Sequence, residues 1–198
     1  PDEPFWESPW GKGRPGWHIE CSVMSQKFLQ TDTLDIHAGG RDLIFPHHEN
    51  EIAQAEALTG KPFAKYWIHH GLLTINGQKM SKSLGNFVII KDFINKYRDA
   101  DILKLFFLST HYSHPIDYTE EKIEEAKKAY ERIDGLMIRL ERLCGVRDLT
   151  QVFSGGAGLI KPFKDEFIAS MDDDFNTPKA LAVLFDMVSR CNKLLDSG

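Results

Sequence analysis

The chain has 198 residues, of which 42% are hydrophobic and 27% are charged, a composition typical of globular proteins. Its formal net charge of −5 gives no bulk attraction for nucleic acid, so a nucleic-acid partner would have to bind a local basic face. The apolar runs are too short to span a membrane, and three widely spaced cysteines favour a reducing, cytoplasmic location over a disulfide framework.

The first part of the chain alternates helix and strand patterns behind a Pro- and Gly-rich opening segment without an initiator methionine. In chain order we predict a helix over 18–29, a strand over 33–37, a glycine turn at 39–40, a helix over 47–58 and a strand over 66–73. A turn at 75–78 follows, because Asn76-Gly77 is a hairpin signal. This alternation is typical of an α/β fold.

The second part of the chain is predicted to be all-α. Short helices over 91–97 and 100–109 precede a long amphipathic helix that Thr119 caps and that runs to about residue 143. Its apolar stripe consists of Ile123, Ala126, Tyr130, Ile133, Met137 and Leu140. After a glycine-containing loop at 151–158, helices are predicted over 163–171 and, with Thr177 as cap, over 178–195.

The run Lys79-Met80-Ser81-Lys82-Ser83, followed by Leu84-Gly85-Asn86, is the most informative motif. Two lysines framed by serines make a short loop, rich in hydrogen-bond donors, that can fold over a triphosphate. A solvated Lys/Ser turn is the alternative interpretation. Because the particular string is far rarer than its composition, we favour nucleotide binding.

A second set of residues could bind a metal. His47 and Glu51 are four residues apart, so on a helix they project to the same side. Together with Cys21 they offer the sulfur, nitrogen and oxygen ligands that zinc accepts. His48 is less favoured, since Ile52 stands four residues beyond it. The residues alone also permit a polar helix start and a buried structural cysteine.

Four motifs in this order resemble the cysteinyl-tRNA synthetases, a family of class I aminoacyl-tRNA synthetases. They are Gly13-Arg14-Pro15-Gly16-Trp17-His18-Ile19-Glu20-Cys21-Ser22, Asp35-Ile36-His37-Ala38-Gly39-Gly40, Phe45-Pro46-His47-His48-Glu49-Asn50-Glu51 and Lys79-Met80-Ser81-Lys82-Ser83-Leu84-Gly85-Asn86. The resemblance implies the second half of a Rossmann-type catalytic domain over 1–78, a lysine-loop and stem-contact region over 79–118, and a helical bundle near tRNA over 119–198.

The resemblance also implies a reaction and a metal. Cysteine would be activated with ATP and magnesium to cysteinyl-adenylate and then transferred to tRNA, with zinc selecting the thiolate. Cys21, His47 and Glu51 match three of the family's four zinc ligands. The fourth ligand and the HIGH-type ATP signature belong to a preceding half that this sequence lacks, so we expect the chain alone to be inactive.

Further roles follow by matching positions to the family. Trp17 and His37 would line the amino-acid pocket, and Asp42 would bind the substrate ammonium group. Gly39 and Gly40 would allow close approach of the nucleotide. Lys82, assisted by Lys79, would stabilise the phosphates as pyrophosphate leaves. Without the resemblance, Trp17 reads as an ordinary aromatic and Asp42 as a helix cap.

The tRNA-binding face is predicted on the long helix, which carries Lys127, Lys128, Arg132, Arg139 and Arg142. Interleaved glutamates make a solvated, salt-bridged helix the alternative. A related ligase that joins cysteine to a glucosaminyl-inositol is a rival function, and a non-catalytic fragment that binds zinc and RNA is another. We expect no membrane partner and favour a monomer.

Overall fold

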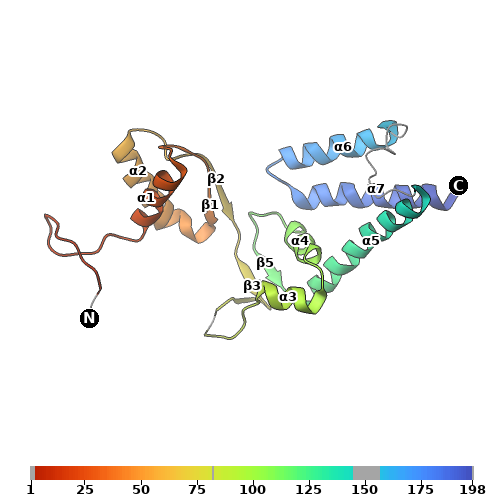
Figure 1. Cartoon of the computed structure of the whole chain (residues 1–198), viewed down its shortest axis with the longest axis horizontal. Coiled ribbons are helices and arrows are strands. Elements are labelled where there is room, and N and C mark those ends of the chain that lie inside the picture. Colours follow the sequence, from red (N-terminus) through yellow and green to blue (C-terminus); the bar gives the residue numbers. More distant parts are fainter. Residues whose placement is uncertain (1–2, 82, 145–156, 198) are drawn as a thin grey trace. The chain divides into compact units, whose positions relative to one another are not determined.

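The structure is a computed structural model that describes residues 3–81, 83–144 and 157–197. It divides into two compact units, one ending at Gly71 and the other beginning at Leu72. Figure 1 labels helices α1 and α2 and strands β1 and β2, which belong to the first unit, and strands β3 and β5 and helices α3 to α7, which belong to the second. Each unit is described by itself.

The first unit is a β–α–β arrangement preceded by a helix. Helix α1 (His18–Leu29) packs against α2 (Glu49–Thr59), and strand β1 (Leu34–Gly40) pairs in parallel with β2 (Ala64–His70). The buried core consists of Leu34, Ala55 and Phe63, with Trp67 packed against it. A parallel pair needs a helical crossover, which α2 supplies, so the α/β prediction is confirmed for this unit.

The predicted glycine turn after the first strand is wrong. Gly39 and Gly40 lie inside β1, paired with His69 and His70. A Cβ on Gly39 would come within 2.7 Å of the His48 ring, so glycine is needed there for close packing rather than for a turn. The chain turns only afterwards, through η1 (Arg41–Leu43) and η2 (Ile44–His48), and α2 begins two residues later than predicted.

The second unit opens with a small sheet that the sequence pattern did not predict. Strand β3 (Leu73–Ile75) pairs with β4 (Gln78–Lys79) in an antiparallel hairpin and with β5 (Ile116–Tyr118) in parallel. The predicted turn between β3 and β4 is confirmed, because Asn76 and Gly77 have φ values of 50° and 74°. Short strands such as β5 carry too few residues for a period-two signal.

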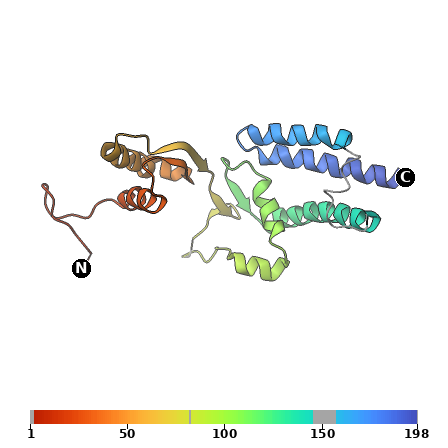
Figure 2. The same cartoon turned by 45° about the horizontal axis from the view of Figure 1, so that its top comes forward.

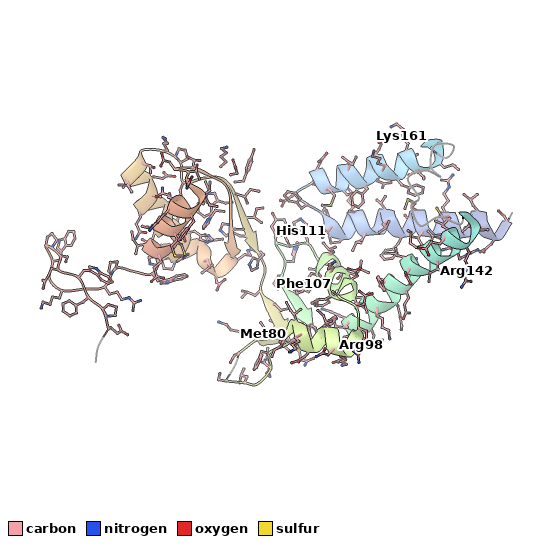
Figure 3. The ribbon with its side chains drawn as sticks, viewed as in Figure 1. Met80, Arg98, Phe107, His111, Arg142 and Lys161 are labelled. Atoms are coloured by element: carbon pink, nitrogen blue, oxygen red, sulfur yellow. The ribbon has the colours of Figure 1, made fainter. Side chains whose placement is uncertain are left out.

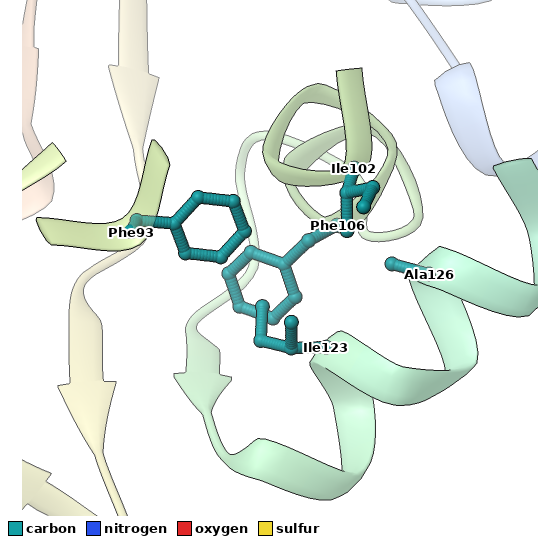
Figure 4. Close-up of a cluster of buried hydrophobic side chains, with 5 residues drawn as sticks. All are labelled: Phe93, Ile102, Phe106, Ile123 and Ala126. Atoms are coloured by element: carbon teal, nitrogen blue, oxygen red, sulfur yellow. The ribbon is translucent and has the colours of Figure 1, made fainter. Parts of the chain in front are cut away.

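Helices complete this unit. Short helices α3 (Ile90–Tyr97) and α4 (Asp101–Leu108) precede the long α5 (Glu120–Cys144). Their common core, drawn in Figure 4, contains Phe93, Ile102, Phe106, Ile123 and Ala126. Ile123 and Ala126 belong to the predicted apolar stripe of α5 and are buried, but Leu136, which the prediction omitted, is buried as well.

Helices α6 (Ala157–Asp172) and α7 (Thr177–Ser197) lie side by side in both Figure 1 and Figure 2 and pack against each other. Most of the predicted loop at 151–158 falls outside the described residues, although residues 157 and 158 are helical. Thr177 is the first residue of α7 rather than its cap. Asn176 performs that role, since its Oδ1 accepts the backbone N–H of Lys179 at 3.3 Å.

The turn between α6 and α7 is tied to the segment before β5. His111 donates from Nε2 to the Asp174 carbonyl at 2.9 Å, and Tyr112 donates its hydroxyl to Asp174 Oδ1 at 2.7 Å. Asp174 and Phe175 both have φ values of 52°, a conformation that residues with a Cβ seldom adopt. These contacts therefore hold a turn that the local sequence does not favour.

Candidate metal centre and lysine loop

The three predicted metal ligands converge in the first unit. Helix α1 provides Cys21, the η2 segment provides His47, and the first turn of α2 provides Glu51. One ligand atom from each lies within 4.8 Å of the others, close enough for all three to bind a common ion. His47 and Glu51 are buried and Cys21 is half-buried.

The surroundings of the Glu51 carboxylate show whether a metal ion fits this site. Its Oε1 lies 2.6 Å from His47 Nε2, and its Oε2 lies 2.7 Å from His37 Nε2. Neither pair is aligned as a hydrogen bond, and within the described residues both oxygens are buried without a hydrogen-bond partner. Buried carboxylate oxygens without a hydrogen bond are costly, so a carboxylate that lies among possible nitrogen and sulfur ligands fits a bound cation.

The electrostatics of the site follow from burial. Removal from water raises the pKa of Glu51 to about 7, while the nearby Cys21 thiol acts in the opposite direction. Burial also raises the pKa of Cys21, and the Glu51 charge adds to that effect. The pKa of His47 is lowered by burial and by His18. A neutral imidazole is the form that ligates metals.

Other side chains orient the histidines. His47 Nδ1 lies 3.0 Å from His18 Nδ1, which leaves Nε2 of His47 for the carboxylate side. Trp17 stacks on the His47 ring with centroids 3.6 Å apart and keeps half of its own surface exposed. Partners of this kind fix the ring and the nitrogen that a histidine presents to a metal.

A second possible ligand group shares Glu51. His37, from β1, and His48, from η2, have ligand atoms within 4.8 Å of each other and of the Glu51 carboxylate. Burial, followed by the effects of His37, His69 and His47, lowers the pKa of His48 to about 4. The sequence analysis assigned His37 to the amino-acid pocket by resemblance to the family, and it disfavoured His48 because Ile52 stands four residues beyond it.

The remaining predicted residues lie at different places. Asp42 is exposed in η1, where its Oδ1 stands so close to Gly40 that a Cβ there would overlap it. Lys79 is an exposed residue of β4, in the second unit. Lys82 lies outside the described residues. On α5, Arg139 bonds Asn192 and Asp196 of α7, so it is used for helix packing.

The lysine loop leaves the end of the β3–β4 hairpin, and Met80 marks its start in Figure 3. The Asn86 side chain joins the two limbs of the loop. Its Oδ1 accepts the Ser81 N–H at 2.9 Å, and its Nδ2 donates to the Lys79 carbonyl at 3.1 Å. The described part of the loop is thus held by hydrogen bonds.

Comparison with known families identifies the class of protein. Residues 1–128 match the family described as "tRNA synthetases class I (C) catalytic domain", and residues 166–198 match the DALR domain. Because the first match covers more than half of the chain, the protein belongs to the class I tRNA synthetase catalytic-domain family. Its β–α–β unit is the Rossmann-like part of that domain, and the helices that follow include the DALR region.

The relatives narrow the class further. A protein of Thermodesulfovibrio yellowstonii named cysteine–tRNA ligase is 54% identical over 99% of this chain, and one of the same name from Geobacillus sp. strain WCH70 is 56% identical over 96%. The chain therefore resembles cysteine–tRNA ligases, as its motifs predicted. It spans only 40% and 41% of the length of these two relatives.

Solved structures agree on the fold. A LeuRS–tRNA–LeuAMS ternary complex of Agrobacterium radiobacter K84 has a TM-score of 0.70 at 15% identity and covers 93% of this chain and 28% of that one. Mycobacterium tuberculosis methionyl-tRNA synthetase with methionyl-adenylate has a TM-score of 0.63 at 21% identity, covering 82% and 34%. None of the described helices is long and apolar enough to cross a membrane.

Proposed function

We propose that the chain is part of a cysteine–tRNA ligase, which activates cysteine with ATP and magnesium and transfers it to tRNA. The observation that carries this proposal is the convergence of Cys21, His47 and Glu51, whose buried carboxylate oxygens have no hydrogen-bond partner among the residues that the structure describes. The relatives of the same name support it.

In this proposal Cys21, His47 and Glu51 hold zinc. The ion, when bound, supplies a soft Lewis acid that favours a thiolate over a hydroxyl group and so rejects serine. A hydrophobic pocket alone would discriminate such close analogues weakly. Trp17, which stacks on His47, and His37 would line the amino-acid pocket.

Adenylate formation requires the cysteine carboxylate to attack the α-phosphorus of ATP as pyrophosphate leaves. Lys79 and Lys82 would bind the triphosphate and neutralise the charge that develops on the leaving group. Asp42 would accept hydrogen bonds from the substrate ammonium group, and Gly39 and Gly40 would admit the nucleotide. The helical unit would contact tRNA, with the ligase acting in the cytoplasm.

Exchange of pyrophosphate into ATP by the full-length protein tests the proposal. We expect exchange that depends on cysteine and not on serine, and charging of tRNA. The variant Cys21→Ser should lose at least about a hundredfold in kcat/KM for cysteine, since a hydroxyl is a poor zinc ligand. Cys191→Ser, which alters a half-buried cysteine of α7, serves as the matched control.

Two results would contradict the proposal. Equal cysteine activation and zinc content in Cys21→Ser and wild type would remove the metal from substrate selection. Consumption of a glucosaminyl-inositol without tRNA charging would assign the rival ligase function. The match to a DALR domain, together with the relatives' names, favours the tRNA reaction.

A further inference from the structure

The hairpin at the base of the lysine loop is bonded to a residue of β5, a strand that is distant in the sequence but adjacent to β3 in the sheet. Asp117, on β5, accepts two hydrogen bonds through Oδ1, from the Thr74 hydroxyl at 2.6 Å and from the Gly77 N–H at 2.8 Å. The Asn76 N–H also donates to the Tyr118 carbonyl at 3.1 Å. The hairpin that carries Lys79 is therefore fixed to the sheet on one side.

Among the described residues no strand directly follows the other end of the loop, and there the Asn86 side chain hydrogen-bonds across the loop instead. One amide side chain contains both a donor and an acceptor, and Asn86 uses both across the loop. Aspartate lacks the donor and alanine lacks both groups. The preceding Gly85 has a φ of 64°, in the left-handed region, so the backbone turns back sharply just before Asn86.

We propose that Asn86 is a positioning residue for Lys79: it holds the Lys79 carbonyl and the Ser81 amide, and so fixes where the Lys79 side chain begins. This inference rests on the proposed function, in which Lys79 contacts the phosphates of ATP. An ångström of misplacement at a catalytic group lowers a rate strongly, so two loop hydrogen bonds are enough to matter.

Steady-state pyrophosphate exchange by the full-length protein gives the first test. Asn86→Ala should lower kcat about tenfold and leave the KM for cysteine within about twofold, because the metal centre is built by other elements. Asn86→Asp, which loses the bond to Lys79, should lose most of the same activity. Asn95→Ala, on the exposed face of α3, is the matched control and should equal wild type.

A double-mutant cycle separates positioning from general loss of structure. If Asn86 acts through Lys79, Asn86→Ala should cost less than about twofold once Lys79→Ala is present. The proposal would be overturned if the two substitutions lowered kcat independently, so that their effects multiplied. It would also be overturned if Asn86→Ala or Asn86→Asp had the same kcat as Asn95→Ala.

Limited tryptic digestion tests the clamp without relying on catalysis. The Lys79–Met80 bond should be cut several-fold faster in Asn86→Ala than in wild type, with cleavage at other lysines as the reference. Equal cleavage rates would overturn the positioning role even where exchange is active. Wild-type protein that lacks cysteine-dependent exchange would instead overturn the proposed function, and the digestion result would still decide whether Asn86 holds the loop.

Discussion

Glu51 is the residue on which the metal centre depends most. It belongs to both possible ligand groups, it is fully buried, and its two oxygens face histidine nitrogens without hydrogen-bond alignment. A buried carboxylate in such surroundings is destabilising unless a cation compensates it. Binding of a cation beside Glu51 would therefore remove a free-energy cost that the protein without the ion bears.

This reasoning gives a prediction for Glu51→Gln. The amide keeps the shape of the carboxylate but loses its charge, so we expect zinc to bind at least about tenfold more weakly. Competition with a chromogenic chelator on the full-length protein measures the affinity. The control is Glu49→Gln, which alters an exposed glutamate in the same first turn of α2. Equal affinities in the two variants would exclude Glu51 as a ligand.

At the residue scale, the sequence predicted ligands that share a helix face and missed those that do not. His47 and Glu51 were found through their i, i+4 spacing, and Cys21 through its chemistry. The proximity of His37 and His48 depends on how β1 and η2 meet, which no local period encodes. Gly39 was misread as part of a turn because its cause, the ring of His48, comes from a later segment.

Among the elements, the long helix α5 and the short helix α4 pack against each other over a buried core in the second unit. Phe106 is 1% exposed and lies among Phe93, Ile102 and Ile123, whereas the adjacent Phe107 is 45% exposed. Figure 3 labels Phe107 on α4, and Figure 4 shows Phe106 directed into the core. Adjacent phenylalanines on one helix thus have different surroundings.

Truncation of these two residues should have unequal effects. Phe106→Ala should lower the stability of α4 and α5 by about 3–5 kcal/mol, the usual cost of deleting a buried ring, and Phe107→Ala by less than about 1 kcal/mol. Amide hydrogen exchange in α5 reports this local stability without requiring the whole chain to unfold together. Similar exchange rates in both variants would contradict the assigned core.

Helices were predicted better than strands at the element scale. The bounds of α1 agree with its prediction, and the cap at Thr119 is confirmed by its hydroxyl, which accepts the Lys122 N–H at 3.2 Å. By contrast, β4 and β5 contain two and three residues, and their pairing to β3 depends on long-range contacts. A short strand has too few positions to show alternation.

For the molecule as a whole, the first unit exposes surface that folded proteins normally cover. Its sheet has two parallel strands, yet Ile36 of β1 and Tyr66 of β2 are 58% and 68% exposed. On α1, Phe28 and Leu29 are similarly exposed. Parallel sheets in α/β proteins are covered on both faces. The chain matches 40% of the length of its relatives, and such surface is expected where a larger sheet continues.

We therefore expect the 198-residue chain by itself to show no detectable cysteine-dependent pyrophosphate exchange. Its exchange rate should lie at least about a thousandfold below that of the full-length protein. The purified chain should also enhance the fluorescence of an apolar dye that the full-length protein leaves unchanged. Robust exchange by the purified chain would show that these 198 residues suffice for catalysis. The domain boundaries at 78 and 118 remain predictions.

Strand β5 is three residues long, yet the chain at and just before it contacts two parts of the second unit that are far apart in the sequence. Just before it, His111 and Tyr112 form hydrogen bonds to Asp174 in the turn that joins α6 and α7. At its centre, Asp117 accepts hydrogen bonds from the β3–β4 hairpin. One short segment of chain, from His111 to Tyr118, therefore contacts both the α6–α7 turn and the hairpin that carries Lys79.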